Sequence, residues 1–324
     1  MLIAQTPLRV SFLGGGTDFD DFYIHYGGAV LSTAIDKYAF VMVKERFDEM
    51  IYVNYSKKEI ARNVNELEHE LVREAMKVTG VENGVEISTF VDVREGSGLG
   101  SSSSITVGLL QALYTYKGEI KPADTLAREA CQIEVDILGK PMGRQDQYIA
   151  AYGNMRFITF SQTGINLEKV PLSKEAKRKL NEKLMLFFTN KTRRSGDILA
   201  EQKDNISQRI EVLKEMTKLA YQGKEAIIKE AFDDLGGMLH RGWQLKKQLA
   251  SKVSDSDLDG MYQTALKNGA IGGKITGAGG GGFLLLYAPP ERRDDIRSAL
   301  WGLEEIPFRF EADGSKVIFD YRRS

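Results

Sequence analysis

Hydrophobic and polar positions along this chain predict an alternation of strands and helices. The strand pattern, in which β-favouring side chains alternate with polar ones, is found in residues 30–43, 51–55 and 85–93. Helical spacing of apolar residues is found in segments 65–78, 101–116 and 122–138. Gly118 and Gly139 follow the last two segments, in the position where glycine commonly ends a helix.

The polar segment 161–183 separates two halves of the chain. A strand is expected just before it, at residues 156–160, and we place the domain boundary inside it. The sequence therefore predicts an N-terminal domain at residues 1–170 and a C-terminal domain at residues 171–324. Further helices are expected at residues 197–222, 224–252 and 258–268. Further strands are expected at residues 184–189 and on both sides of the glycine-rich segment 277–282.

Composition and charge narrow the class of protein. The 324 residues, 42% hydrophobic and 27% charged, suffice for two domains with cores of their own. The chain has 44 basic and 45 acidic residues, so its net charge is close to zero. We therefore expect neither nucleic acid nor a membrane surface as partner. No apolar run approaches the ~20 residues that a membrane helix needs. The lone cysteine, Cys131, and the lack of a secretory-signal pattern lead us to expect a cytoplasmic protein.

A glycine- and serine-rich segment at residues 96–104 is the strongest chemical signal. Gly96, Gly98 and Gly100 alternate with small residues, and four serines then open the expected helix at residue 101. Such a loop exposes backbone N–H groups at a helix N-terminus, and its hydroxyls can reach phosphate oxygens or a metal ion. The segment therefore predicts a polyphosphate site, with an ordinary flexible loop as the alternative.

Other nucleotide-binding motifs are absent. No glycine-lysine pair is followed by Ser or Thr as the Walker motif requires, and neither H-R-D nor D-F-G is present. Gly277, Gly279 and Gly282 match G-x-G-x-x-G, but an apolar strand pattern follows them where the dinucleotide-binding fold needs a helix. The phosphate loop at residues 96–104 thus belongs to a different class of site.

Two further segments, residues 7–18 (PLRVSFLGGGTD) and 274–283 (KITGAGGGGF), accompany the phosphate loop. In this order, the three segments resemble the three motifs of the GHMP small-molecule kinases, the superfamily of galactokinase, homoserine kinase and mevalonate kinase. The resemblance implies an α+β, two-lobed fold, with an N-lobe like the second domain of ribosomal protein S5 and a ferredoxin-like C-lobe. It further implies that ATP and the acceptor meet between the lobes, with ATP bound by Gly96, Ser97, Gly98, Leu99, Gly100, Ser101 and Ser102.

The same resemblance implies the catalytic residues. Asp146 lies in a G-x-x-D-Q sequence, a setting in which the family's sugar kinases hold an Asp beside the attacking hydroxyl. The family places a cation from its first motif next to this Asp, which falls on Arg9 here. A cation at that position would stabilise developing negative charge. From spacing alone, Asp146 is equally well explained as the N-cap of a helix.

Glu134 is the expected magnesium ligand. It precedes Asp146 by the family's interval, and its carboxylate with the Ser102 hydroxyl makes an oxygen set suited to Mg²⁺. Asp136 is a competing choice. Because residues two apart on a helix face different directions, we expect at most one of Glu134 and Asp136 to point at the phosphates. Without the resemblance, a structural role is favoured for Glu134, in which it pairs with Arg128 or faces solvent.

The first motif also bears on the acceptor. Galactokinase has Gly-Glu-His-Thr-Asp where this chain has Gly14-Gly15-Gly16-Thr17-Asp18, so polar side chains are lost and space is gained. The longer segment of residues 9–19, continued by residues 26–37, is most similar to the bacterial D-glycero-D-manno-heptose 7-phosphate kinases, which phosphorylate an anomeric hydroxyl. L-fucose kinases share parts of this pattern. The resemblance implies a substrate site made of Gly15, Gly16, Thr17, Asp18, Gly277, Ala278, Gly279 and Gly280.

A second anion site is expected at residues 190–197. Cations and hydroxyls gather there between an expected strand and an expected helix, and Arg193 is predicted to bind the sugar's own phosphate. The alternative is a solvated basic turn.

Two alternatives to a heptose phosphate kinase remain, a kinase of a neutral sugar such as L-fucose and a sensor without turnover. The joint presence of Arg9, Glu134 and Asp146 weighs against the sensor.

Overall fold

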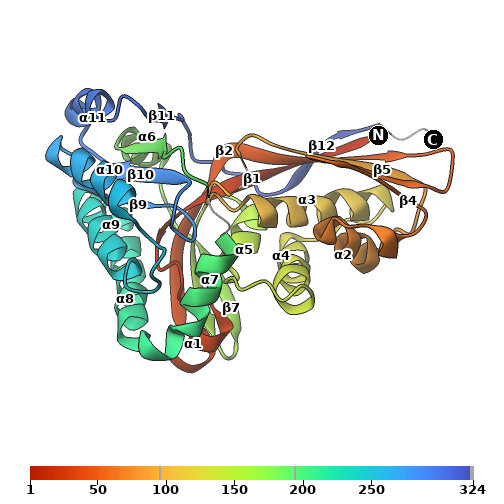
Figure 1. Ribbon diagram of the computed structural model, residues 1–324, viewed down its shortest axis with the longest axis horizontal. Coiled ribbons are helices and arrows are strands. Elements are labelled where there is room, and N and C mark those ends of the chain that lie inside the picture. Colours follow the sequence, from red (N-terminus) through yellow and green to blue (C-terminus); the bar gives the residue numbers. More distant parts are fainter. Residues whose placement is uncertain (95, 193–194, 322–324) are drawn as a thin grey trace.

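The computed structural model describes residues 1–94, 96–192 and 195–321, which form the predicted α+β, two-lobed structure (Figure 1). In the first lobe, eight strands form one sheet in the order β12-β1-β2-β5-β3-β4, with β6 and β7 attached beside β2. Its strands are β1 (Leu2–Leu13), β2 (Gly28–Glu45), β3 (Ile51–Asn54), β4 (Lys58–Ala61), β5 (Val85–Val91), β6 (Met155–Ser161), β7 (Gly164–Lys169) and β12 (Lys316–Asp320).

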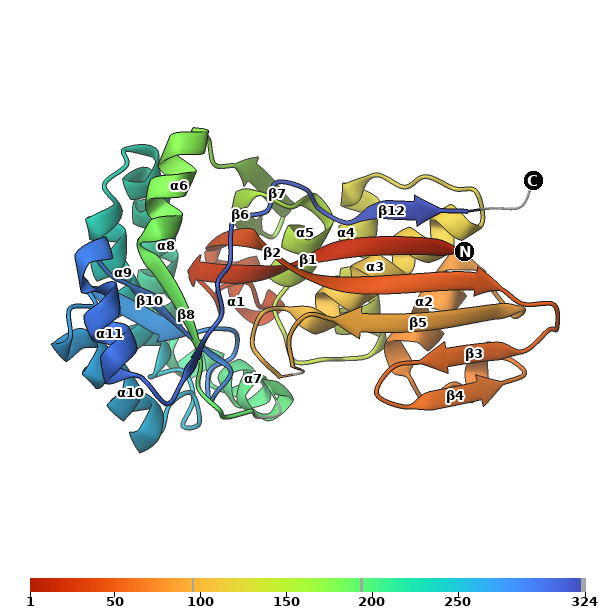
Figure 2. The same ribbon diagram turned by 90° about the horizontal axis from the view of Figure 1, so that it is seen from above.

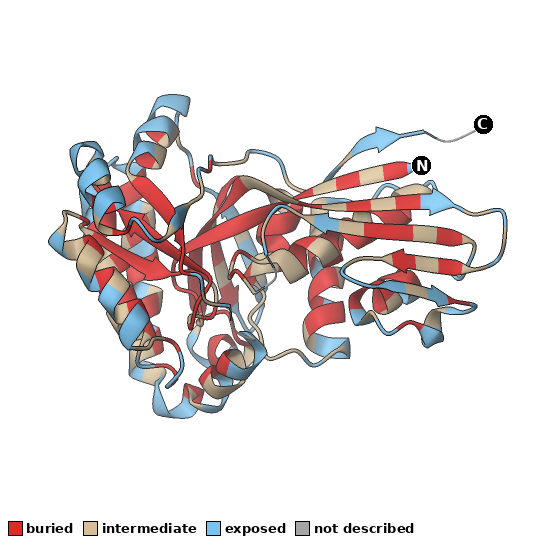
Figure 3. Cartoon of the chain, turned by 45° about the horizontal axis from the view of Figure 1, so that its top comes forward, coloured by how far each residue is buried: buried red, intermediate tan, exposed pale blue. Residues whose placement is uncertain are grey.

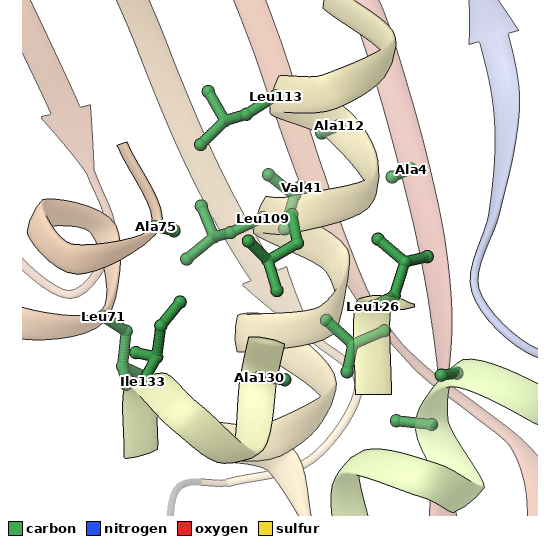
Figure 4. Packing of buried hydrophobic residues seen from close by; sticks show 14 of the residues in the cluster. Ala4, Val41, Leu71, Ala75, Leu109, Ala112, Leu113, Leu126, Ala130 and Ile133 are labelled. Atoms are coloured by element: carbon green, nitrogen blue, oxygen red, sulfur yellow. The ribbon is translucent and has the colours of Figure 1, made fainter. Parts of the chain in front are cut away.

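Helices cover one face of this sheet in the half that lies away from the second lobe. They are α2 (Glu70–Thr79), α3 (Ser101–Tyr116), α4 (Ala123–Cys131) and α5 (Gln145–Tyr152). Val41 of β2 packs with Leu109 of α3 and Ala75 of α2 in a single core (Figure 4). Figures 2 and 3 show the opposite face open to solvent, and there Phe90 of β5 is 58% exposed. The alternation in the later part of β2 reflects this one-sided burial, whereas the first eight residues of β2 are all buried.

The second lobe is built on an antiparallel sheet in the order β11-β8-β10-β9. Its strands are β8 (Leu184–Phe188), β9 (Gly272–Ile275), β10 (Phe283–Tyr287) and β11 (Glu304–Glu305), and its helices are α6 (Lys174–Glu182), α8 (Ile210–Ile228), α9 (Phe232–Lys246), α10 (Ser256–Lys267) and α11 (Arg293–Ala299). Every residue of β8 is buried, because Leu186 packs into one core and Phe187 into another on the opposite face. A strand that is buried on both faces has an unbroken run of apolar residues in its sequence.

A shared core joins the lobes. The carboxyl half of β1 packs Val10 and Phe12 into the same hydrophobic cluster as Leu186 of β8 and Leu285 of β10. Two short helices, α1 (Asp20–Tyr26) and α7 (Ser195–Asp204), complete the described chain. Strand β12 lies beside β1, so the last strand returns to the first sheet (Figure 2). We propose that the boundary between the two lobes lies near residue 170. Strand β12 comes after this boundary in the sequence but belongs to the sheet of the first lobe.

Several elements differ from the sequence prediction. Segment 161–183 was predicted to be a polar connection, yet it forms β7 and α6. Predicted helix 122–138 is α4 followed by a π-helical turn at Gln132–Ile137. Predicted helix 197–222 is divided into α7 and α8 by a 3₁₀ turn at Ile206–Gln208.

The break predicted at Gly223 is also wrong, because α8 continues through it to Ile228. A Cβ at Gly223 would lie 2.3 Å from Leu13 Cδ1, so this glycine serves the close packing of α8 on β1. No helix within the described ranges is long and apolar enough to cross a membrane, and the cytoplasmic location stays a prediction.

Candidate active site

Arg9 and Asp146 form a buried pair between β1 and α5. Arg9 Nε donates to Asp146 Oδ1 at 2.7 Å, and Nη2 donates to Oδ2 at 2.6 Å. Only 7% of the Arg9 side chain and 13% of the Asp146 side chain is exposed. Arg144 occupies the N-cap position of α5 and Asp146 lies inside the helix, so the N-cap interpretation of Asp146 is wrong. The carboxylate is held in one orientation by a two-point contact.

The phosphate loop is fixed between Arg9 and the third motif. Arg9 Nη1 donates to Gly98 O at 2.6 Å, and the Arg9 backbone N–H donates to Leu99 O at 3.0 Å. A Cβ at Gly98 (φ +76°) would lie 2.6 Å from Thr276 O, and one at Gly277 would lie 2.6 Å from Gly98 Cα. The two glycine loops therefore touch backbone to backbone, which only glycine permits.

A cavity of about 760 Å³ opens in front of this loop. Arg9 and Asp146 line it together with Gly96, Gly98, Gly100, Ser101, Ser102 and Lys140. Helix α3 begins at Ser101, directly after Gly100 in its left-handed conformation (φ +77°), so its first N–H groups lie at the cavity wall. The remaining two residues of the predicted ATP loop, Ser97 and Leu99, are fully buried behind it. A polyphosphate suits these surroundings.

Glu134 lies behind Ser102. Ser102 Oγ donates to Glu134 Oε1 at 2.7 Å, and Gln147 Nε2 donates to Oε2 at 2.8 Å. The carboxylate is fully buried, and burial raises the pKa of Glu134. Lys140 Nζ is 4.0 Å from Oε1, at the edge of the larger cavity.

The alternatives to Glu134 as a metal ligand are explained by other contacts. Arg128 pairs with Asp124 at 2.9 Å rather than with Glu134. Arg144 Nη2 donates to Asp136 Oδ1 at 2.6 Å, so Asp136 is engaged in an ion pair. Within the described part of the chain, no group of three or more His, Cys, Asp or Glu side chains could hold a metal ion by itself. Ser102 and Glu134 fit Mg²⁺, which binds through few protein oxygens and completes its shell with phosphate and water.

A second cavity, of about 70 Å³, lies against the same Arg9–Asp146 pair. Gly15, Gly16 and Asp18 of the first motif line it. Asp18 Oδ1 accepts from Gly16 N at 3.0 Å, and Oδ2 accepts from Gln145 Nε2 at 3.0 Å. Burial raises the pKa of Asp18. Both cavities are lined by Arg9, Asp146, Gly277 and Ala278, so the Arg9–Asp146 pair lies where the cavities meet.

The structure places some predicted substrate residues elsewhere. Thr17 is fully buried, and its Oγ1 donates to Gly14 O at 2.8 Å and Ala29 O at 3.1 Å, closing the turn after β1. Gly280 N donates to Val253 O at 2.7 Å, and a Cβ at Gly279 would lie 2.7 Å from the same oxygen. Neither cavity is lined by Thr17, Gly279 or Gly280, so we do not retain them as substrate contacts.

Two buried lysines border the smaller cavity and were not predicted. Lys246 Nζ donates to Gly277 O, and Lys274 Nζ donates to Ser11 O at 2.9 Å and Phe12 O at 3.3 Å. Burial lowers the pKa of both lysines, that of Lys246 to about 8. A sequence signal for Lys246 exists, because it continues the buried stripe of Leu239 and Trp243 on α9.

The predicted phosphate-binding turn borders the larger cavity. Thr192 and Ser195 line that cavity, while Arg193 lies outside the described residues. Lys191 Nζ is bound to Asp255 at 2.9 Å and to Asp257 at 2.5 Å. The charge of Lys191 is thus compensated by the start of α10.

Residues 69–154 match the GHMP kinases N terminal domain, and residues 224–302 match the GHMP kinases C terminal family. The chain is 30% identical over 314 residues to the D-glycero-alpha-D-manno-heptose 7-phosphate kinase of Campylobacter jejuni, covering 91% of this chain and 92% of that protein. It is 28% identical over 327 residues to the bifunctional fucokinase/GDP-fucose pyrophosphorylase of Arabidopsis thaliana, covering 91% of this chain and 31% of that protein.

Among solved structures, a D-glycero-D-manno-heptose 1-phosphate kinase from Bacteroides thetaiotaomicron has the same fold, with a TM-score of 0.84 at 24% identity over 99% of this chain and 100% of that chain. The N-terminal family match includes the phosphate loop, Glu134 and Asp146, and the C-terminal match includes Lys246 and the third motif. The chain therefore belongs to the GHMP kinase family and is a phosphotransferase with a hydroxyl acceptor.

Proposed function

We propose that this chain is an ATP- and Mg²⁺-dependent sugar kinase that phosphorylates the anomeric C1 hydroxyl of D-glycero-D-manno-heptose 7-phosphate. The observation that carries the proposal is the position of Asp146, fixed by Arg9 where the two cavities meet. The similarity to the C. jejuni heptose 7-phosphate kinase, over nine-tenths of both proteins, favours this acceptor among sugars.

In the proposed reaction the acceptor hydroxyl lies in the smaller cavity and the ATP phosphates lie in the larger one. Asp146 accepts the hydroxyl proton as the oxygen forms a bond to the γ-phosphorus, and the bond to the β–γ bridging oxygen breaks, which releases ADP. Arg9 orients Asp146 and offers positive charge beside the attacking oxygen.

The nucleotide phosphates are proposed to bind at the N-terminus of α3 and the glycine loop before it, with Lys140 close by. Ser102 and Glu134 are the residues proposed to hold Mg²⁺. When bound, the metal ion neutralises charge on the phosphate oxygens. Asp18, with Gly15 and Gly16 beside it, is proposed to bind sugar hydroxyls.

Another sugar 1-kinase, such as an L-fucokinase, is the second candidate. It is supported by the 28% identity to the Arabidopsis bifunctional enzyme over most of this chain. A binding protein without turnover is less well supported, because a sensor has no need of the Arg9–Asp146 pair. The two enzymatic candidates differ in whether the acceptor carries a phosphate of its own.

An acceptor panel tests the proposal. Purified protein with Mg·ATP would be assayed for ADP release with D-glycero-D-manno-heptose 7-phosphate, the unphosphorylated heptose, L-fucose and D-galactose. We expect the highest kcat/KM with the heptose phosphate, and a product in which ³¹P NMR finds a second phosphate, at C1. A preference for L-fucose would establish the second candidate, and sugar binding without ADP release would establish a sensor.

A further inference from the structure

Three side chains that donate hydrogen bonds lie at the smaller cavity. The described residues do not supply an acceptor for every hydrogen that these side chains can donate. Lys246 comes from α9, Lys274 from β9 and Ser11 from β1, and all three line the cavity. They are only 4%, 5% and 5% exposed, respectively. Ser11 Oγ is buried and has no hydrogen-bond partner among the described residues. A buried hydroxyl in this state points to a ligand that completes its bonding.

Neither lysine is neutralised by a carboxylate of the described chain. Lys246 Nζ donates to one backbone carbonyl and Lys274 Nζ to two, although each ammonium has three hydrogens to donate. Within the described residues no Asp or Glu oxygen lies within 4.0 Å of either nitrogen. A buried cation with so little compensation is costly unless a ligand supplies the negative charge.

The surrounding charges offset this excess only in part. The charged residues lining the cavity are Arg9, Lys246 and Lys274 against Asp18 and Asp146. Arg9 occupies both carboxylate oxygens of Asp146, and Asp18 accepts three N–H groups from Gly16 and Gln145. The two lysines therefore remain available to an incoming anion.

Gly15 leaves the space for such a group. A Cβ at this position would lie 3.6 Å from Ser11 Oγ and 4.0 Å from Lys246 Nζ. With glycine, this side of the cavity keeps the space that a Cβ would fill between Ser11, Lys246 and Gln145, whose Nε2 would lie 3.6 Å from it.

We propose that Lys246, Lys274 and Ser11 bind the phosphate group that the acceptor already carries, so that the site selects a phosphorylated sugar. This inference rests on the proposed kinase function and names the subsite that distinguishes a sugar phosphate from a neutral sugar. The bound phosphate accepts hydrogen bonds from the two ammonium groups and the hydroxyl. The sequence assigned this role to Arg193, which lies outside the described residues.

The position of the cavity identifies which phosphate this is. None of the phosphate-loop residues 96–102 lines the smaller cavity, whereas Gly96, Gly98, Gly100, Ser101 and Ser102 line the larger one. The Arg9–Asp146 pair lies between them. A nucleotide phosphate on the glycine loop is therefore on the other side of the reactive pair from Lys246.

Lys246→Met, compared with Lys247→Met, tests the proposal. Lys247 follows Lys246 directly and is the C-cap of α9. Its Nζ pairs with Asp259 at 3.2 Å, away from the cavity. We expect Lys246→Met to raise KM for heptose 7-phosphate by about tenfold to a hundredfold, the effect of one hydrogen bond to a charged group. The KM for unphosphorylated heptose and for ATP should not change, and Lys247→Met should leave all three KM values unchanged.

Other outcomes would overturn the inference. An equal loss with both heptoses would place Lys246 at the reacting hydroxyl, and a raised KM for ATP would place it on the nucleotide. Unchanged kinetics in both Lys246→Met and Lys274→Met would remove the subsite. Melting temperatures show whether each variant folds, and Ser11→Ala serves if a lysine variant does not.

A binding experiment separates this inference from the proposed function. Calorimetric titration of the protein with inorganic phosphate, without nucleotide, should show binding that Lys246→Met abolishes and Lys247→Met preserves. If no sugar is phosphorylated but this binding is present, the kinase assignment fails and the anion site stands. If sugars are phosphorylated but phosphate binds both variants alike, the anion site fails alone.

Discussion

Arg9 and Asp146 are 137 residues apart in sequence and bind each other through two parallel hydrogen bonds of 2.7 and 2.6 Å. The pair connects β1 with α5, and through Gly98 O it also connects both elements with the phosphate loop. A single guanidinium thus sets the orientation of the carboxylate and the position of the loop. The first and central motifs act together because Arg9 touches both.

Replacing Arg9 should therefore impair turnover more than binding. We expect Arg9→Gln to lower kcat by about a hundredfold or more, because Asp146 loses its orientation and the attacking oxygen loses a nearby positive charge. Arg144→Gln is the matched control, since Arg144 binds Asp20 in the same two-point manner but lines neither cavity. Steady-state kinetics that gave both variants similar kcat values would contradict the assigned role of Arg9.

Glu134 and Asp136, two residues apart, should differ in their effect on the metal requirement. We expect Glu134→Gln to raise the half-saturating Mg²⁺ concentration by about tenfold to a hundredfold, because a ligand charge is lost beside Ser102. Asp136→Asn weakens only the ion pair with Arg144 and should leave that concentration unchanged. A magnesium titration of the rate at saturating ATP decides between them, and the opposite ranking would move the metal site to Asp136.

The contact between the two glycine loops predicts a large cost for a single methyl group. Gly98→Ala places a Cβ 2.6 Å from Thr276 O at a φ of +76°, so we expect it to lower the free energy of unfolding by about 2 kcal/mol or more and to weaken ATP binding. Gly260→Ala in α10 is the control, because a Cβ there meets nothing within 4 Å. It should stabilise the protein by roughly 0.5–1 kcal/mol. Urea unfolding measures both changes, and equal stabilities would refute the close approach.

Lys246→Met should stabilise the protein at neutral pH in a pH-dependent way. Burial lowers the pKa of Lys246 from 10.5 to about 8, so between these values the unfolded chain binds more protons than the folded one. Wild-type stability therefore carries a constant penalty below pH 8, of about 3 kcal/mol at 1.36 kcal/mol per pH unit, and recovers it as the pH rises to 10.5.

The stability difference between Lys246→Met and wild type is the quantity to measure, because titrating groups that do not interact with Lys246 cancel in it. Arg9, Asp18, Asp146 and Lys274 face the same cavity and are present in both proteins. We expect the advantage of the variant to be largest at pH 7 and to shrink by pH 10. A difference that stays constant across this range would show that Lys246 does not titrate as expected.

Much of the fold could be predicted because local signals were strong. Glycine followed by serines placed the start of α3 at Ser101, and the unbroken apolar run of β8 marked a strand buried on both faces. Segment 161–183 misled the prediction because β7 pairs only with β6 and α6 buries only Ala176 and Leu180. Polar composition there reflects exposure and does not mark a connection.

Site residues could be predicted where they belong to a sequence motif. They could not be predicted where their position depends on how distant segments pack together. Glu134 and Asp136 could not be ranked from spacing, since only the folded chain brings Arg144 to Asp136. Thr17 lies within a motif that lines the smaller cavity, yet its hydroxyl closes a turn. Lys246 has no motif, and its importance follows from burial beside Gly277, a contact that depends on how α9 docks on the second sheet.

The most direct test of the account compares the wild type with Asp146→Asn, using heptose 7-phosphate and Mg·ATP. Asp20→Asn is the control, because Asp20 also binds an arginine, Arg144, but lies outside both cavities. The account predicts that Asp146→Asn lowers kcat by about a hundredfold to ten-thousandfold with little change in either KM, while Asp20→Asn retains near wild-type kcat. A kcat for Asp146→Asn within about threefold of the wild type would contradict the assignment of Asp146 as the proton acceptor.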